Sequence, residues 1–226
     1  MNTAPLVLGG ARLLLDPSGA LFWPEESLLV VADLHLEKGT AFDRHGLILP
    51  PWDSVETLAA LEDAIERHAP ARLLALGDSF HDAGGWARLD RTLKARLLAI
   101  AAQVETVWLS GNHDPEPNPE LPGHRAMIAS AGPFVFRHEA SVDRADEQIE
   151  ISGHFHPKAR MRLRGQLIAR ACFIADKRRV ILPAFGAYTG GLDVSDPAIA
   201  GLFPRGATIF MRGRHNVYRF DRAAAA

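Results

Sequence analysis

The first half of the chain alternates short, mainly apolar runs with segments of helical periodicity. Residues 28–32, 73–76 and 106–109 form the apolar runs, which are typical of strands covered on both faces. Between the first two runs, apolar residues recur at helical spacing at Val55, Leu58, Leu61 and Ile65. A second helical set lies between the last two runs, at Trp86, Leu89, Leu93, Leu97 and Ile100. This strand–helix–strand–helix–strand order predicts parallel βαβ units.

Proline and turn residues set the limits of several of these elements. Two prolines at positions 50 and 51 interrupt the chain before the first helix, which Asp53 or Ser54 can cap. The sequence Asp-Pro-Ser-Gly at residues 16–19 lies between apolar runs and is a turn signal. It predicts a hairpin-like start over residues 6–23.

The pattern changes after the proline-rich segment 115–122, where short apolar runs follow one another with little helical periodicity. These runs are residues 134–136, 149–151, 166–168, 180–182, 208–210 and 217–220. They predict a second sheet that is largely antiparallel. No linker or internal repeat separates the two halves, so we expect one domain over residues 1–226.

Polar residues follow each predicted parallel strand. Asp33 and His35 follow the first strand, Asp78 follows the second, and Asn112 and His113 follow the third. Because the carboxyl ends of parallel strands share one edge of a sheet, we expect these side chains to converge. Carboxylates and imidazoles suit divalent transition metals such as manganese, iron or zinc. One carboxylate can bridge two such ions about 3.5–4 Å apart, the arrangement used in phosphoryl chemistry.

A pair of histidines, His154 and His156, follows the apolar run at residues 149–151. Two imidazoles in an i, i+2 relation point the same way if the backbone stays extended. They could then reach two metal ions that lie side by side, one each. Taken singly, an Asp or Asn after a strand is a common turn residue, but that explanation does not cover the whole set.

Four ordered motifs resemble those of the calcineurin-like metallophosphoesterases. They are Asp33-Leu34-His35, Gly77-Asp78, Gly111-Asn112-His113-Asp114 and Gly153-His154-Phe155-His156. The resemblance covers nearly the whole chain. It implies an α/β fold, a four-layer αββα sandwich of two mixed β-sheets with helices outside, and a hydrolase of phosphate esters.

A narrower resemblance is carried by residues 31–39, 76–81 and 182–191. These segments are similar to the bacterial ligase-associated DNA-damage-response phosphoesterases. That subgroup implies a DNA-repair endonuclease whose partner proteins are a ligase, a helicase and an exonuclease. The role of the glycine-rich segment 182–191 stays open.

The family resemblance also implies roles for individual residues, with two divalent ions, first of all Mn²⁺ and otherwise Fe or Zn. The first ion would be held by Asp33, His35, Asp78 and His156. The second would be held by Asp78, Asn112, His138 and His154, with Asp78 bridging. His113 would stay unligated and donate a proton to the leaving group, with Asp114 orienting it, work that suits a group titrating near neutrality.

Some of these assignments have alternatives. His138 is favoured over His124 as the intermediate ligand because it follows the run at residues 134–136, although Glu139 stands where many relatives have glycine. Three isolated histidines are interpreted as structural, namely His45, His68 and His215.

Further candidates could contact the substrate. His81 lies three residues beyond Asp78 and either lines the pocket or caps the helix that follows. Lys38 and Arg44 could meet substrate phosphates, but exposed bases after a loop are common.

Composition and charge narrow the function classes. The formal net charge of −2 gives no overall attraction to nucleic acid or membrane. Segment 158–179, however, carries one acidic residue, Asp176, against a block of basic ones: Lys158, Arg160, Arg162, Arg164, Arg170, Lys177, Arg178 and Arg179. Such a block can steer a polyanion or form a solvated rim.

Cysteine content and the search for targeting and membrane segments indicate the cellular compartment. Cys172 is the single cysteine, which excludes an intrachain disulfide and suggests a small buried hydrophobe. No signal peptide is evident, and no apolar run approaches the roughly 20 residues of a membrane span. We expect a cytoplasmic protein without membrane contact.

Three functions stay in competition. The favoured one is a nuclease that cleaves phosphodiesters in nucleic acid, presumed DNA. A small-molecule phosphatase or nucleotide phosphodiesterase is the alternative enzyme, because the metal centre does not choose the leaving group. A non-catalytic scaffold of the same fold is the third, and the intact ligand and proton-donor set argues against it.

Overall fold

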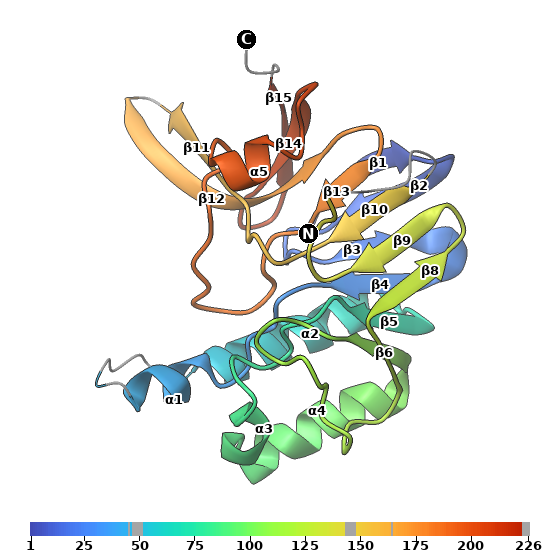
Figure 1. Cartoon of the computed structure of the whole chain (residues 1–226), viewed down its shortest axis with the longest axis vertical. Helices are drawn as coiled ribbons and strands as arrows, with labels where there is room; N and C mark the ends of the chain where they lie inside the picture. Colours follow the sequence, from blue (N-terminus) through green and yellow to red (C-terminus); the bar gives the residue numbers. More distant parts are fainter. Residues whose placement is uncertain (45, 47–51, 143–147, 164, 223–226) are drawn as a thin grey trace.

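A computed structural model describes residues 1–44, 46, 52–142, 148–163 and 165–222. His45 and Arg164 therefore lie outside the described residues. Figure 1 shows two sheets packed face to face, with the long helices below the first sheet. The predicted fold class is confirmed: two mixed sheets with flanking helices. The expectation of one domain over residues 1–226 stays a prediction.

The first sheet has seven strands in sequence order. They are β1 (Ala4–Leu8), β2 (Ala11–Leu15), β3 (Leu21–Trp23), β4 (Leu28–Val31), β5 (Arg72–Ala75), β6 (Glu105–Leu109) and β7 (His124–Ala126). The N-terminal strands pair antiparallel, which confirms the hairpin-like start, and β4 to β7 pair parallel. A short 3₁₀ turn, η1 (Pro24–Glu26), precedes β4.

The second sheet has eight strands, and most of its neighbouring pairs are antiparallel. In spatial order they are β15 (Val217–Arg222), β14 (Ala207–Arg212), β12 (Gln166–Ala175), β13 (Arg179–Ile181), β10 (Ile149–Ser152), β9 (Phe134–Arg137) and β8 (Ile128–Ala131), with β11 (Lys158–Leu163) paired to β12. The exceptions are β9–β10 and β10–β13, which run parallel. These two parallel pairs make the sheet mixed.

Helices cover the outer faces unequally. The first sheet packs against α2 (Asp53–His68) and α4 (Arg91–Gln103), while α1 (Lys38–Asp43) and α3 (Gly85–Arg88) lie at its edge. Among the described residues, the outer layer of the second sheet is only the single turn α5 (Pro197–Ala200). None of the described helices is long and apolar enough to cross a membrane.

The second predicted helix is two helices. The first, α3, ends at Arg88, and the side chain of Asp90 accepts hydrogen bonds from the backbone N–H groups of Thr92 and Leu93 to start α4. The helical spacing of apolar residues continues across this break, so the pattern could not show it. An N-cap carboxylate of this kind is worth about 1 kcal/mol.

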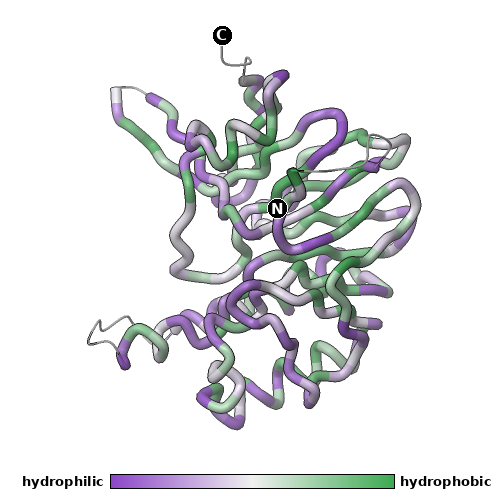
Figure 2. Tube along the Cα trace, viewed as in Figure 1, coloured by the Kyte–Doolittle hydropathy of each residue, from purple (hydrophilic) through white to green (hydrophobic). Residues whose placement is uncertain are grey.

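One hydrophobic core lies between the two sheets. Leu13, Leu74, Phe134, Phe136 and Phe173 are among its buried side chains. Figure 2 shows hydrophobic residues along the strands, where the sheets face each other. A second cluster lies between β4–β6 and α2 and α4. With both faces covered, β4, β5 and β6 hold the loops at their carboxyl ends in a fixed relation.

Candidate metal centre

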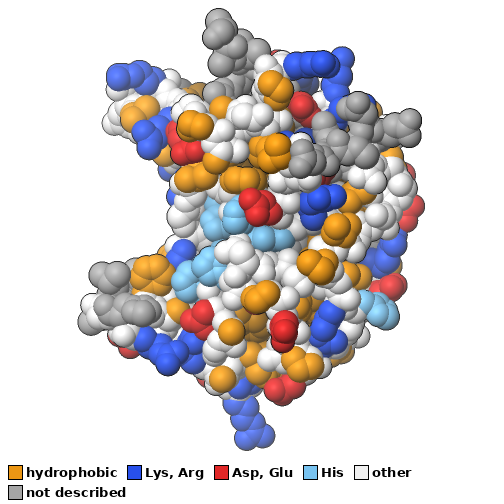
Figure 3. All heavy atoms as spheres, viewed as in Figure 1, with side chains coloured by type: hydrophobic (Ala, Val, Ile, Leu, Met, Phe, Trp, Pro, Cys, Tyr) orange, Lys and Arg blue, Asp and Glu red, His pale blue; other side chains and the backbone are white. Residues whose placement is uncertain are grey.

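The segments that follow the strands of both sheets meet in one place. Asp33 follows β4 and Asp78 follows β5, at one edge of the first sheet. His138 and His154 follow β9 and β10, which run parallel in the second sheet. The backbone N–H of His154 donates to Oδ2 of Asp33 at 3.0 Å, so the two edges are in contact. Figure 3 shows the histidine side chains gathered in a hollow between the two halves of the molecule.

The first group of donor atoms belongs to Asp33, His35 and His156. Their ligand atoms all lie within 4.8 Å of one another. The Nε2 atoms of the two imidazoles are 3.2 Å apart, and Nε2 of His156 is 3.5 Å from Oδ1 of Asp33. Burial lowers the pKa of His35 to about 3, so its ring is neutral at pH 7 and offers a lone pair.

The second group belongs to Asp78, His138 and His154. Nε2 of His138 is 3.4 Å from Oδ2 of Asp78 and 3.1 Å from Nδ1 of His154. The amide oxygen of Asn112 lies 2.8 Å from the first of these nitrogens and 2.9 Å from the second. Nδ1 of His138 faces the carbonyl oxygen of Leu76 at 2.8 Å, which leaves Nε2 with its lone pair toward the group.

Asp78 connects the two groups. Its Oδ2 is within 4 Å of a nitrogen in each, 3.4 Å from His138 and 3.8 Å from His35. Its Oδ1 accepts the backbone N–H of His113 at 2.9 Å, which fixes the plane of the carboxylate. A carboxylate in this position can be shared by two cations.

The donor set fits divalent transition metals. Two pairs of ring nitrogens face each other at 3.2 and 3.1 Å, and two buried carboxylates, Asp33 and Asp78, point into the same space. Burial raises the pKa of Asp78, and burial also lowers the pKa of His154. Converging lone pairs and carboxylates repel one another unless cations lie among them. Mixed nitrogen and oxygen ligands of this type suit manganese, iron or zinc.

The backbone at these residues is not extended. The φ angles are 55° at Asp33, 43° at His35, 50° at Asp78, 69° at His154 and 46° at His156. The histidine pair does divide between the two groups, but the extended backbone expected for it is wrong. A left-handed turn at each histidine aims the rings instead. Such conformations are rare for non-glycine residues and cluster at functional sites.

The role of the segment 182–191 was left open by the sequence, and residues 185 and 186 of this segment, with the adjacent residue 192, contact both ligand loops. Phe185 and Gly186 donate their backbone N–H groups to the carbonyl oxygens of Ala32 and Asp33, at 2.8 and 3.1 Å. A Cβ atom at Gly186 would lie 2.1 Å from the carbonyl oxygen of Leu34, so only glycine allows this approach. At the loop that carries His154 and His156, the backbone N–H of Leu192 donates to the carbonyl oxygen of Phe155 at 3.3 Å.

His113 stands beside the two donor groups. Its Nδ1 is 2.7 Å from the carbonyl oxygen of His81, so the ring carries a hydrogen on Nδ1 and leaves Nε2 free. The ring lies 5.0 Å from that of His35, centroid to centroid. His35, His81 and His113 also have nitrogens within 4.8 Å of one another, so the ring could in principle be a ligand.

The resemblance implied that Asp114 orients His113, but the structure does not show this contact. Its Oδ2 accepts the backbone N–H groups of Ser79 and Phe80 at 2.8 and 3.1 Å, and the carbonyl of His81 holds the imidazole instead. Asp114 therefore shapes the turn after β5. Burial raises the pKa of its carboxyl to about 7, although the two N–H groups oppose the shift.

His81 lines the site rather than capping a helix. Its ring stacks on His113 at 5.0 Å with an interplanar angle of 25°, and burial lowers its pKa to about 4. Lys38 lies with Nζ 5.7 Å from the centroid of the Phe42 ring, and burial and the charge of Lys158 lower its pKa.

The other candidates lie apart from the donor groups. Arg44 is exposed at the C-cap of α1, where its backbone N–H donates to the carbonyl oxygen of Phe42, and its side chain forms no hydrogen bond or ion pair with a described residue. His124 is exposed in β7 and belongs to neither donor group, so the structure favours His138 over it. His68 is structural as expected, with Nε2 2.9 Å from Asp16, and His215 is exposed.

Comparisons with known proteins found one matching family and several similar structures. The family profile described as calcineurin-like phosphoesterase matches residues 27–161. A nuclease MPE from Pseudomonas putida has a similar structure, with a TM-score of 0.75 and 24% identity over 97% of this chain and 100% of that chain. The phosphoesterase YfcE from E. coli matches with a TM-score of 0.45 and 13% identity over 85% of this chain and 97% of that chain. No curated protein sequence matches the chain.

Proposed function

The chain belongs to the calcineurin-like phosphoesterases, hydrolases that act on phosphoester bonds with divalent metals, and we propose that it cleaves phosphodiesters in nucleic acid. The observation that carries the proposal is the position of Asp78, whose Oδ2 is within 4 Å of both His35 and His138. One carboxylate shared by two donor groups is the arrangement that dinuclear hydrolysis needs.

In this proposal the two groups hold one divalent ion each. The first ion is held by Asp33, His35, Asp78 and His156, and the second by Asp78, Asn112, His138 and His154. When bound, such ions lower the pKa of a water molecule and neutralise charge on the phosphate. Manganese is the proposed ion, with iron or zinc as alternatives, because imidazole and carboxylate are mixed in each group.

His113 is the proposed proton donor. The carbonyl of His81 takes the hydrogen on Nδ1, so Nε2 is the atom that can carry a transferable proton. Imidazole is suited to this step because its ordinary pKa lies near neutrality. His81, stacked on the same ring, keeps it aimed at the hollow. Transfer of that proton to the departing oxygen releases an alcohol, such as the sugar hydroxyl of a cleaved strand.

Nucleic acid, and DNA in particular, is the proposed substrate for three reasons. The motifs resemble the ligase-associated repair subgroup, and the similar Pseudomonas putida protein is a nuclease. In addition, the β11–β12 ribbon projects beside the hollow and carries Arg160 and Arg162 in alternate positions of β11 (Figure 1). A cytoplasmic location, and a ligase, helicase and exonuclease as partners, are part of this proposal.

Hydrolysis of model esters with manganese tests the proposed chemistry. We expect faster turnover of bis(p-nitrophenyl) phosphate than of p-nitrophenyl phosphate, together with cleavage of defined DNA strands. A preference for the monoester would favour a small-molecule phosphatase. Turnover of neither ester, nor of DNA or RNA, would favour a non-catalytic scaffold.

The ribbon is tested separately by neutralising Arg160, Arg162 and Arg164 to glutamine. Each lost contact with a DNA phosphate should reduce the slope of log K against log salt by about 0.9 for a duplex. Arg160 also contacts Asp193 at 3.3 Å, so its contribution should be the smaller one. Arg91, exposed on α4, supplies a control substitution with the same charge change. An unchanged slope in the triple variant would remove the ribbon from the proposal.

A further inference from the structure

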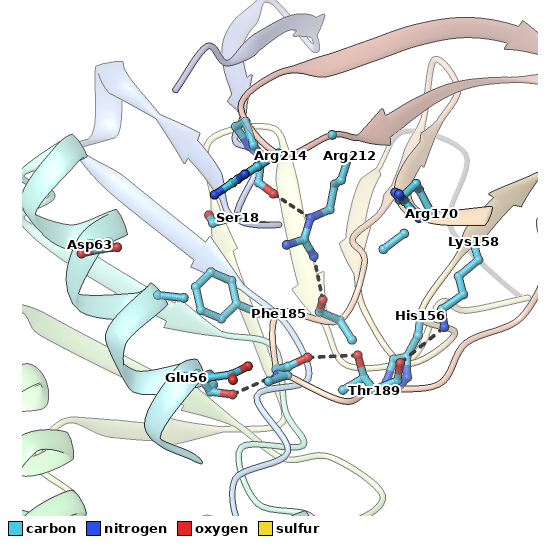
Figure 4. A pocket seen from close by; sticks show the side chains of 18 of the residues that line it. Ser18, Glu56, Asp63, His156, Lys158, Arg170, Phe185, Thr189, Arg212 and Arg214 are labelled. Carbon is cyan, nitrogen blue, oxygen red and sulfur yellow. Dashed lines mark hydrogen bonds between the residues drawn. The ribbon is translucent and has the colours of Figure 1, made fainter. Parts of the chain in front are cut away.

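A cavity of about 600 Å³ opens beside the first donor group and is not used by the chemistry described above. His156 is one of its lining residues, so the cavity borders the first donor group. Its other walls come from α2, from the 184–190 segment, from β12 and from the turn after β14 (Figure 4). Pockets of this volume accommodate ligands the size of one nucleotide.

Two of the cations around the cavity serve the fold. Arg67 lies 3.0 Å from the buried carboxylate of Asp16. Arg212 donates to the carbonyl oxygens of Pro17 and Ala184 at 2.8 and 3.2 Å. These contacts tie both guanidinium groups to the protein, so we assign neither of them to a ligand.

The other three cations are available. Lys158, Arg170 and Arg214 all line the cavity, and none of them forms an ion pair with a residue that the structure describes. Nζ of Lys158 donates only to the carbonyl oxygen of Thr189, at 3.4 Å, and Arg170 only to the adjacent carbonyl of Ala169. Unpaired cations next to a phosphoesterase centre are suited to a phosphate group other than the one that is cleaved.

The opposite wall has a different character. Exposed carboxylates of Glu56 and Asp63 stand on α2, and between the two walls lie the apolar side chains of Ala171, Ala184 and Phe185. Figure 4 shows Glu56 and Asp63 on one side of the cavity, with Lys158 and Arg170 on the other. A nucleotide has the matching asymmetry: an anionic phosphate, an apolar base face, and N–H donors on the edge of the base.

We propose, from the charge and polarity of these lining residues, that the cavity binds the nucleoside phosphate unit next to the scissile bond. This inference rests on the proposed function. The phosphate lies at Lys158 and Arg170, and the base lies between α2 and the 184–187 segment. A base enters such a cavity only when it is unpaired. The cavity therefore selects single-stranded nucleic acid, or a free nucleotide ester, over duplex.

Two variants test the cavity without touching a donor residue. Ala169→Trp fills it from the exposed part of β12 with no change of charge, and Gln166→Trp adds the same bulk to the same strand outside the cavity as its control. Arg170→Ala with Arg214→Ala removes two cations, and Arg91→Ala is a charge control on α4.

The primary readout is a ratio of kcat/KM values for two diesters with the same leaving group. These are the p-nitrophenyl ester of thymidine 5′-monophosphate and bis(p-nitrophenyl) phosphate. We expect the wild-type protein to prefer the nucleoside ester at least about tenfold, and both cavity variants to abolish that preference while the controls keep it. No preference in the wild type, or an unchanged ratio in both cavity variants, would overturn the inference and leave the phosphodiesterase proposal intact.

Binding supplies a readout that does not need turnover. Thymidine 5′-monophosphate should bind the metal-free protein in calorimetry, and Ala169→Trp should weaken that binding at least about tenfold. If the esters are not hydrolysed but this result holds, the proposed function fails and the cavity assignment stands. Equal binding to Ala169→Trp and wild type would refute the cavity assignment. Cleavage of single-stranded and duplex oligonucleotides by Ala169→Trp then shows whether a strand or a free nucleotide occupies the cavity.

Discussion

Replacing His113 with alanine should separate proton donation from metal binding. The ring makes one hydrogen bond to a described residue, from Nδ1 to the carbonyl of His81 at 2.7 Å. Its contribution to Asp78 comes from the backbone N–H at 2.9 Å, which alanine keeps. The substitution therefore leaves every donor of the two groups in place. We expect full metal content and a large loss of turnover.

The size of the loss should depend on the leaving group. A positioned general acid contributes about 10²–10⁴-fold, which corresponds to about 3–5 kcal/mol of barrier. A sugar alkoxide needs that proton as it departs, so cleavage of DNA should fall by this full factor. A p-nitrophenolate is stable as an anion, so hydrolysis of bis(p-nitrophenyl) phosphate should fall much less.

The assay combines kinetics on both substrates with metal content measured by mass spectrometry after dialysis. His124→Ala is the matched control, because that histidine is exposed in β7 and outside both donor groups. A fall in metal content that parallels the fall in activity would show that His113 is a ligand, as its nearness to His35 and His81 would permit. Equal losses on both substrates would refute the general-acid role.

Three further predictions concern buried carboxylates. Asp78→Asn should lose both metals, since a neutral amide is a poor bridge, and metal analysis that finds two ions at full occupancy would contradict the bridging role. Asp114→Asn tests the carboxyl whose pKa burial raises to about 7 in the folded protein, against about 3.9 unfolded. Because the pKa of Asp114 is higher in the folded protein than in the unfolded chain, the wild type loses unfolding free energy as pH rises above the unfolded pKa. The loss reaches its full size once pH exceeds about 7. The unfolding free energy of metal-free Asp114→Asn should therefore gain on wild type by up to about 4 kcal/mol between pH 4 and 8, and urea titrations that show a constant difference would rule this out. Glu150→Ala removes the carboxylate that lies 2.9 Å from the buried Arg179 guanidinium. It should lower the unfolding free energy by about 3–5 kcal/mol and leave the metal content unchanged. A loss below about 1 kcal/mol in urea unfolding would show that this ion pair is not critical for stability.

Strands β4, β5 and β6 could be predicted because most of their residues are buried. Their buried residues form short, mainly apolar runs, while Arg72 and Glu105 at the starts of β5 and β6 are not buried. Strands β7 and β8 could not be recognised, because their residues are exposed or half-buried and include His124 and Arg125. The ribbon formed by β11 and β12 was recognised only at residues 166–168, since solvent faces much of it and its charged residues mask the alternation.

The meeting of the donor residues could also be predicted, because it follows from the shared edge of parallel strands. Their local geometry could not. Histidine rarely adopts a positive φ, so the sequence predicted an extended backbone at His154 and His156. The hydrogen-bond partners of Asp114 could not be predicted either. The N–H groups of Ser79 and Phe80 point toward its carboxylate only in the folded turn after β5.

The glycines of the motifs can be explained by the same geometry. A Cβ atom at Gly111 would lie 2.1 Å from Oδ1 of Asp78, and one at Gly153 would lie 2.6 Å from Oδ2 of Asp33. These two glycines therefore make room for a carboxylate that belongs to a different motif, whereas a Cβ atom at Gly77 would lie 2.7 Å from the carbonyl oxygen of Ser110. Since the ligand of one loop fixes the residue allowed in another, the motifs form one steric unit rather than four independent signals. This mutual constraint explains why their ordered occurrence predicts the site, whereas an Asp or Asn after a strand predicts only a turn.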